Sequence, residues 1–238
     1  MSYRLLQKII KYITRNFSLL VTPFLIVLIL FFMSGCGAKK KAAEEAFELA
    51  PEKERILTPA QKRVAAWHAL MREKRGAPEM EMLKSVNSFF NNLEFVDDLY
   101  LWGTEDYWAT PQEMLTINGG DCEDFATAKY FTLRHLEIPD EKMRLTYVKS
   151  LTFEQPHMVL SFYQEPTAEP LILDSLVDAI LTASKRPDLL PIYSFNGQGL
   201  WLTRKQSSDR LRGSDNLSLW QELRQRFTQE AIAAPLPE

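Results

Sequence analysis

The sequence predicts an α+β domain in which a helix that begins at a cysteine packs against an antiparallel sheet. Three observations lead to this fold class. Apolar residues recur at helical spacing over 59–93, and a Gly-Gly-Asp-Cys sequence at 119–122 opens a further apolar helix. After 143 the apolar period changes from about 3.6 residues to about 2. Helices followed by a run of strands are typical of the α+β class.

Two packing helices are expected over 59–74 and 78–93, because each segment carries a stripe of apolar residues at helical spacing. The Gly-Ala-Pro sequence at 76–78 separates them, since glycine and proline interrupt helices. The aromatic segment 94–118 that follows is irregular, apart from a short helix expected over 111–117.

The second half of the chain is expected to build the sheet. The helix that follows the cysteine runs over 125–136 and ends before Ile138-Pro139. The remaining patterns predict strands over 143–151, 157–163 and 170–174, a helix over 176–182, a strand pair within 193–202 and an amphipathic helix over 217–232.

The first 37 residues have the layout of a signal peptide or an uncleaved membrane anchor. A basic leader precedes a stretch without charges, whose apolar part over 19–33 is at the short end of what spans a bilayer. Met33-Ser34-Gly35-Cys36 resembles a bacterial lipobox, in which the cysteine receives a lipid; an unmodified Cys36 at the end of a membrane helix is the alternative. In either case the rest of the chain is expected to be exported.

The patterns divide the chain into four regions: a signal or anchor over 1–37, a linker over 38–57, a globular domain over 58–205, and a C-terminal helix and tail over 206–238. Hydrophobic residues make up 46% of the chain and charged residues 25%, a composition that supports a sizeable core. The net charge of -3 argues against a nucleic-acid binder, which needs a basic surface.

Cys122 is a candidate nucleophile. The chain has two cysteines, so Cys122 has no disulfide partner once Cys36 is lipidated, removed or held in a membrane. Gly119-Gly120-Asp121 places the thiol at a helix start with Asp121 as the N-cap, where the helix dipole lowers a thiol pKa. A buried structural cysteine is the alternative, and the acidic neighbours argue against it.

A thiol nucleophile needs a base, and the chain offers His68, His135 and His157. His135 lies about 20 Å along the helix that starts near Cys122, too far for contact, and His68 sits in an apolar helix. His157 begins a strand, and Asp174 ends a neighbouring strand, where a carboxylate needs a partner. We therefore predict a triad of these two residues with Cys122, although a structural histidine remains the alternative from the residues alone.

Six short motifs follow one another in the second half: GGDCEDFA at 119–126, KY at 129–130, IP at 138–139, MRLTYV at 143–148, QPHMVL at 155–160 and LD at 173–174. They resemble the bacterial transglutaminase-like cysteine proteinases, and among them the LapG-type periplasmic proteases. The resemblance covers roughly residues 60–205. It implies a transglutaminase/papain-like cysteine protease fold, with Cys122 as nucleophile, His157 as base and Asp174 as the group that orients the histidine.

The resemblance also implies a function in the periplasm. Such a protease clips a large secreted adhesin near its N-terminus and releases it from the cell surface, and an inner-membrane receptor that senses cyclic di-GMP holds it inactive. The family's calcium dependence carries over to Asp121 and Glu123, with Asp124 as a further ligand. From the residues alone, acids that complement the helix dipole explain these three carboxylates more simply. The resemblance favours calcium, whose charge would offset acids beside a thiolate.

Two other functions stay open. The same triad could carry out acyl transfer of the transglutaminase or peptidoglycan amidase type, or the chain could be an inactive binding module that grips a partner with its aromatic segment 94–108.

The Cys122 N–H is the expected oxyanion donor, and a second donor is expected among Trp102, Tyr107, Trp108 and Asn118. Exposed aromatics near the cleft, with Trp102 and Trp108 as candidates, are predicted to contact the receptor, and a core role for at least one of the two is the alternative.

Overall fold

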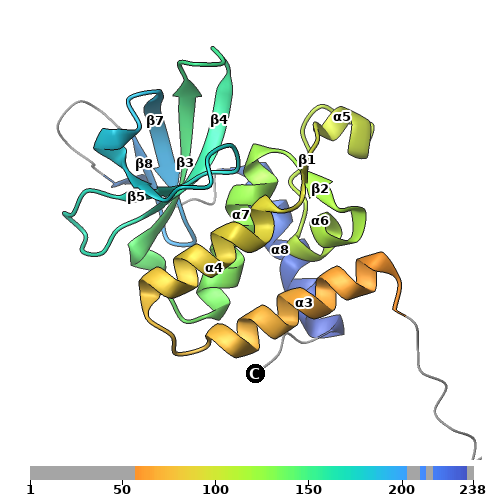
Figure 1. Ribbon diagram of the computed structural model, residues 1–238. Helices are drawn as coiled ribbons and strands as arrows, with labels where there is room; N and C mark the ends of the chain where they lie inside the picture. Colours follow the sequence, from red (N-terminus) through yellow and green to blue (C-terminus); the bar gives the residue numbers. More distant parts are fainter. Residues whose placement is uncertain (1–56, 203–209, 213–216, 235–238) are drawn as a thin grey trace, which may run out of the picture. The chain divides into compact units, whose positions relative to one another are not determined.

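The computed structural model describes residues 57–202, 210–212 and 217–234. The predicted signal or anchor segment with Cys36, and nearly all of the predicted linker, lie outside the described residues. Within the described ranges, no helix is long and apolar enough to cross a membrane. Figure 1 shows the strands forming a sheet, with helices gathered against it. This confirms the predicted α+β class.

The helices form largely where the apolar stripes predict them. In chain order they are α3 (Pro59–Lys74), α4 (Glu79–Asn91), α5 (Asp98–Leu101), α6 (Pro111–Ile117), α7 (Cys122–His135) and α8 (Ser218–Ala233), with short 3-10 helices at Asp140–Lys142 and Ala183–Lys185. Thr58 begins α3 with a capping box: the Gln61 N–H donates to Thr58 Oγ1 (3.2 Å), and the Thr58 N–H donates to Gln61 Oε1 (2.9 Å).

The main sheet is antiparallel and has the order β6-β5-β4-β3-β7-β8-β9. Its strands are β3 (Met143–Ser150), β4 (Pro156–Phe162), β5 (Leu171–Leu173), β6 (Leu181–Thr182), β7 (Leu189–Phe195), β8 (Leu200–Leu202) and β9 (Arg210–Arg212). Leu160 pairs with Leu173, so Asp174, one residue on, comes opposite Val159. Residues that lie opposite each other share a face, and His157 shares the face of Val159. The register therefore brings the side chains of His157 and Asp174 to one face.

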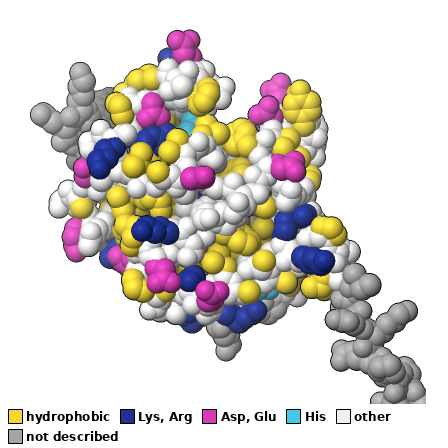
Figure 2. Space-filling model, in the orientation of Figure 1, with side chains coloured by type: hydrophobic (Ala, Val, Ile, Leu, Met, Phe, Trp, Pro, Cys, Tyr) yellow, Lys and Arg dark blue, Asp and Glu magenta, His cyan; other side chains and the backbone are white. Residues whose placement is uncertain are grey.

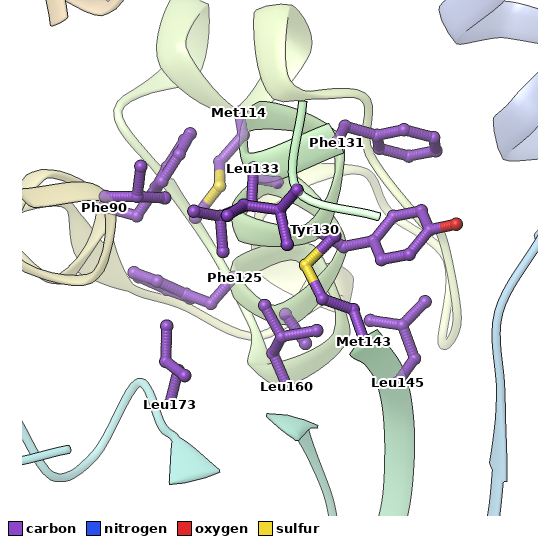
Figure 3. Packing of buried hydrophobic residues seen from close by; sticks show 14 of the residues in the cluster. Phe90, Met114, Phe125, Tyr130, Phe131, Leu133, Met143, Leu145, Leu160 and Leu173 are labelled. Carbon is purple, nitrogen blue, oxygen red and sulfur yellow. The ribbon is translucent and has the colours of Figure 1, made fainter. Parts of the chain in front are cut away.

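Helix α7 packs against β4 and β3, and α4 and α6 pack against α7. Strand residues Leu145, Leu160 and Leu173 meet Phe125 and Leu133 of the helix in one buried apolar cluster (Figure 3). Removing these side chains from water stabilises the contact between helix and sheet. The same contact fixes the beginning of α7 beside the beginning of β4.

The helix predicted over 176–182 is wrong. The segment lies along the sheet edge and ends in β6, which pairs with β5. The Leu176 N–H donates to Asp174 Oδ1 (3.0 Å), and Asn87 Nδ2 of α4 donates to the carbonyl oxygen of Asp178 (3.0 Å). These tertiary hydrogen bonds and the strand pairing engage backbone groups that a helix would need, and they override a weak local helix preference.

A short parallel pair that the sequence did not predict lies directly before Cys122. Strands β1 (Glu94–Phe95) and β2 (Gly119–Gly120) pair so that Glu94 lies opposite Gly119. A Cβ on Gly119 would lie 2.8 Å from the Glu94 carbonyl oxygen, and one on Gly120 would lie 2.5 Å from Asp124 Oδ2. Glycine is therefore required at both positions for this close approach. The pair brings the segment that begins α5 next to the start of α7.

Helix α8 is held to α7 by Trp220, which is fully buried against the rings of Tyr130, Phe131 and Phe195. We expect Trp220→Ala to lower the free energy of unfolding by about 3–5 kcal/mol, because it leaves a cavity among these rings. Urea unfolding followed by circular dichroism measures the loss. The exposed Glu222→Ala on the same helix is the control and should change stability by less than about 0.5 kcal/mol. Equal effects of the two substitutions would contradict the packing described.

Candidate active site

Cys122 is the first residue of α7, as predicted. Asp121 precedes it with extended backbone at the N-cap position, and the Asp121 N–H donates to Asp124 Oδ2 (3.4 Å). The thiol donates to Glu123 Oε2 (3.1 Å). Cys122 is half-buried and is a free cysteine. Its thiol is therefore held at a helix start without being closed off from solvent.

Cys122 and His157 line the same open cleft, which has a volume of about 780 Å³. Tyr147 and Tyr193 stack at one wall, with ring centroids 4.9 Å apart. Figure 2 shows the surface hollowed between the region of α5 and the ends of β3 and β4. The backbone N–H of Met158, the residue after His157, forms a hydrogen bond with the thiol and opposes a rise in its pKa. The structure thus brings the cysteine into contact with the strand that carries the histidine.

His157 and Asp174 are paired: the distance from Nε2 to Oδ1 is 2.8 Å, and both side chains are buried. This bond engages Nε2, so Nδ1 is the ring nitrogen left to exchange a proton with a thiol. Burial raises the pKa of Asp174, but the hydrogen bond and charge of His157 outweigh this effect, and the pKa falls to about 2. Asp174 is therefore ionised at neutral pH and can hold one orientation of the imidazole.

The other two histidines lie away from this cleft. His68, on α3, packs beside Trp67 with 5.4 Å between ring centroids, and burial lowers its pKa. His135 ends α7, where its Nε2 lies 3.3 Å from Arg75 Nη2. Neither lines the cleft that contains Cys122. Their positions agree with the reasoning that left His157 as the candidate base.

The family model of the bacterial transglutaminase-like cysteine proteinases matches residues 60–203. The chain belongs to this family. This proteinase is also similar to solved structures of LapG from Legionella pneumophila. The EGTA-treated structure is 46% identical, has a TM-score of 0.67, and is matched over 72% of this chain and 91% of that chain. The calcium-bound structure is 46% identical, with a TM-score of 0.64 and coverage of 72% and 92%. No curated protein sequence matches the chain.

Membership in the family, together with the antiparallel sheet and its packed helices, confirms the predicted cysteine protease fold. Because it belongs to this family, the protein is a cysteine protease. Most of the motifs from which the sequence predicted it lie on α7, β3 and β4 and at the end of β5, and α7, β3 and β4 contribute residues to the cleft.

Carboxylates crowd the thiol of the proteinase. One oxygen each from Asp98, Asp121 and Asp124 lie within 4.8 Å of one another, and the same holds for Asp98, Asp106 and Glu123. Asp98 and Asp124 are 1% and 0% exposed. Asp124 Oδ1 accepts the Ala109 N–H at 2.6 Å, and Asp98 Oδ2 accepts the Tyr107 N–H at 2.5 Å. These backbone donors form hydrogen bonds with only some of the carboxylate oxygens in the cluster.

The pKa values of the cluster follow from burial and mutual repulsion. Burial raises the pKa of Asp121 and of Asp124, and a neighbouring carboxylate raises each of them further. Burial also raises the pKa of Glu123. The pKa of the Cys122 thiol rises well above its usual range, first through burial and then through Glu123. The helix start alone was expected to lower this pKa, but burial and the neighbouring acids outweigh the dipole.

The cluster fits a hard divalent cation. Asp98 Oδ1 and Asp121 Oδ1 are buried and accept no hydrogen bond. Buried carboxylate oxygens without donors are costly, and calcium takes six to eight oxygen ligands, with carboxylates among its preferred donors. Asp121, Glu123 and Asp124, the three residues that the sequence nominated, all belong to the cluster.

Sequence reasoning missed Asp98 and Asp106. Both lie in the aromatic segment, more than a dozen residues before Cys122, and no spacing in the sequence links them to the acids on α7. The β1–β2 pair brings their segment beside the helix start. The acids among the aromatics of 94–108 were the signal available, but Asp98 and Asp106 could not be singled out from the five of them without that pairing.

Of the four candidates for a second oxyanion donor, Trp108 lines the cleft, and its Nε1 donates to Asp106 Oδ1 (3.0 Å). The Tyr107 hydroxyl donates to Glu113 Oε1 (2.9 Å), and Asn118 Nδ2 donates to Glu94 Oε1 (3.3 Å). Trp102 is half-buried, its ring 4.6 Å from that of Tyr107. The expectation that Trp102 and Trp108 are exposed is wrong, because both pack against the core. The most exposed aromatic of this segment is Tyr100, at 81%, and Phe95 is exposed at 43%.

Proposed function

We propose that the protein is a calcium-dependent endopeptidase of the periplasm that cuts a large secreted adhesin near its N-terminus and releases it from the cell surface. The observation that carries the proposal is the cleft that Cys122 and His157 both line, with Asp174 bonded to the histidine. An inner-membrane receptor that senses cyclic di-GMP inhibits the enzyme. This partner and this substrate are what the resemblance to the LapG-type proteases implies, and the similarity to LapG itself covers 72% of the chain.

The triad residues have distinct roles in this proposal. Nδ1 of His157 accepts the thiol proton while Cys122 Sγ attacks the scissile carbonyl carbon. As the C–N bond breaks, His157 returns the proton to the leaving amine, and a thioester to Cys122 remains. His157 then takes a proton from water, which hydrolyses the thioester and frees the thiol. Asp174 keeps the imidazole in the required tautomer, and the Cys122 N–H donates to the oxyanion.

In this proposal Asp121, Glu123 and Asp124 hold the calcium ion, together with Asp98 and Asp106. A bound cation supplies positive charge, which offsets the carboxylates that raise the pKa of the thiol. The calcium-bound and EGTA-treated structures of LapG support a metal in this family. The leader over 1–37 supports export, and a lipid on Cys36 or an uncleaved anchor would keep the enzyme at the membrane beside its receptor.

Incubation of the full-length protein with N-terminal fragments of candidate adhesins tests the function. We expect one defined cut when calcium is present and none in EGTA, with the Cys122→Ala variant as the inactive control. A fluorescent primary amine in the same reaction identifies acyl transfer. Incorporation of the amine without hydrolysis of any adhesin fragment would establish the transferase alternative and overturn the proposed protease.

A further inference from the structure

Two buried basic side chains contact Asp174 in addition to its histidine partner. Arg186 Nη2 lies 2.8 Å from Asp174 Oδ2, and Lys129 Nζ donates to the Asp174 carbonyl oxygen at 3.1 Å. Arg186 is 6% exposed and Lys129 is 0% exposed. Removing a basic side chain from water costs much free energy, so two of them beside one residue need an explanation.

A second carboxylate, that of Asp188, fixes the orientation of the Arg186 side chain. Its Nε donates to Asp188 Oδ1 (3.0 Å) and its Nη2 to Asp188 Oδ2 (2.7 Å), a two-point contact that fixes the guanidinium plane. The hydrogen bond with Asp188 raises the pKa of Arg186, so the group stays charged. The carbonyl oxygen of Asp188 in turn accepts the Leu151 N–H (2.8 Å) from the loop between β3 and β4. The guanidinium is thereby anchored to the sheet.

Lys129 connects Asp174 to the helix of the nucleophile. It lies on α7 about two turns after Cys122, hence on the same side of the helix. Burial lowers the pKa of Lys129 to about 7, against the opposing charges of Asp174 and Asp178. Asn91 Nδ2 of α4 donates to the same carbonyl oxygen (2.9 Å), so the backbone of Asp174 is held from two helices.

We propose that Arg186 and Lys129 are positioning residues for the proteolytic reaction, because they fix Asp174 relative to His157 and to the helix that carries the nucleophile. Oδ2 is held by Arg186, which leaves Oδ1 for His157 Nε2 and for the Leu176 N–H (3.0 Å). Without these contacts the carboxylate can rotate, and the imidazole loses its fixed tautomer. The inference rests on the triad of the proposed function.

The test uses the full-length protein with calcium and measures the rate at which iodoacetamide alkylates Cys122. Mass spectrometry of the peptide that contains Cys122 reads the rate without interference from Cys36. We expect Arg186→Gln and Lys129→Met each to slow alkylation about tenfold. In the Asp174→Asn background each should change the rate by less than about twofold, because residues that act through Asp174 couple to it. If the two residues had a purely structural role, each substitution would slow alkylation by the same factor in the wild-type and Asp174→Asn backgrounds.

Three controls keep the outcomes distinct. Arg186→Lys retains the charge and should recover at least about a third of the wild-type rate. Lys129→Met replaces a buried cation with an apolar chain of similar length, so its melting temperature should stay within a few degrees even if Arg186→Gln does not fold. Lys142→Met, which removes an ion pair to Glu79 (2.7 Å) away from the cleft, should alkylate at the wild-type rate.

Equal losses in both backgrounds, or no loss in the wild-type background, would overturn the positioning role and leave the protease intact. An Asp174→Asn variant that alkylates as fast as the wild type would instead remove the triad, and the positioning role with it.

Discussion

Replacement of Cys122 by alanine is expected to abolish peptide cleavage, with a loss of at least about 10⁴-fold. The reason is that Sγ forms the covalent bond to the substrate, and among the residues that the structure describes no other thiol lines the cleft. The substitution removes one half-buried sulfur atom, so the melting temperature should change by no more than a few degrees. Gel analysis of an adhesin fragment and a thermal melt measure the two quantities on the same preparation.

The same assay separates the histidines. His157→Ala should be nearly as inactive as the cysteine variant, and Asp174→Asn should lose about 10³–10⁴-fold because the tautomer preference is lost while the shape is kept. His68→Ala and His135→Ala are the matched controls and should remain active, since neither side chain reaches the cleft. If His135→Ala proved as damaging as His157→Ala, the assignment of the base would be wrong.

Removal of calcium is expected to inactivate the enzyme, and added calcium to restore it, with magnesium a poor substitute because it holds its waters. Without the ion, burial and Glu123 keep the pKa of the thiol high, so little thiolate forms at neutral pH. The ion should also raise the melting temperature of the wild type by several degrees, since a ligand at 100 times its dissociation constant contributes about 2.7 kcal/mol. Activity and melting in EGTA and in calcium measure both effects.

Matched variants test which carboxylates bind the ion. Asp121→Asn, Glu123→Gln and Asp98→Asn should each reduce the calcium-dependent shift in melting temperature. The neighbouring Asp97→Asn changes an exposed acid outside the cluster and should keep the full shift. Full activity in excess EGTA after metal stripping would mean that these acids only cap and complement the helix, and the triad would stand without a metal.

The local part of the site could be predicted from sequence because its residues are neighbours in the chain. The Gly-Gly-Asp-Cys sequence placed Cys122 at the start of a helix, and the acids beside it came with the same motif. His157 and Asp174 followed from the alternating strands and from elimination, and the structure pairs them at 2.8 Å. Periodicity and elimination named these residues because each lies at the end of a strand or helix, and the family resemblance then decided against a structural histidine.

The remaining parts depend on contacts between distant segments, which one sequence does not reveal. Asp98 joins the acids only because β1 pairs with β2, and Arg186 reaches Asp174 from beyond the strand β6. The helix prediction over 176–182 was wrong for the same reason. The backbone of this segment forms hydrogen bonds with α4 and with the edge of the sheet rather than within itself. The helix propensity of a segment does not show which hydrogen-bond partners distant elements will supply to it.

The order of the active-site segments along the chain has a consequence for biosynthesis. The thiol emerges from the ribosome at the head of α7, whereas its base and the aspartate belong to strands that are made later and paired across the sheet. Bringing these distant segments together costs chain entropy, and the packing of the complete sheet offsets this cost. A half-made or unfolded chain therefore carries a cysteine of ordinary chemistry, and the ability to cut peptides appears in one step, when the last partner docks. The fold thus delays proteolysis of other proteins until the chain is complete.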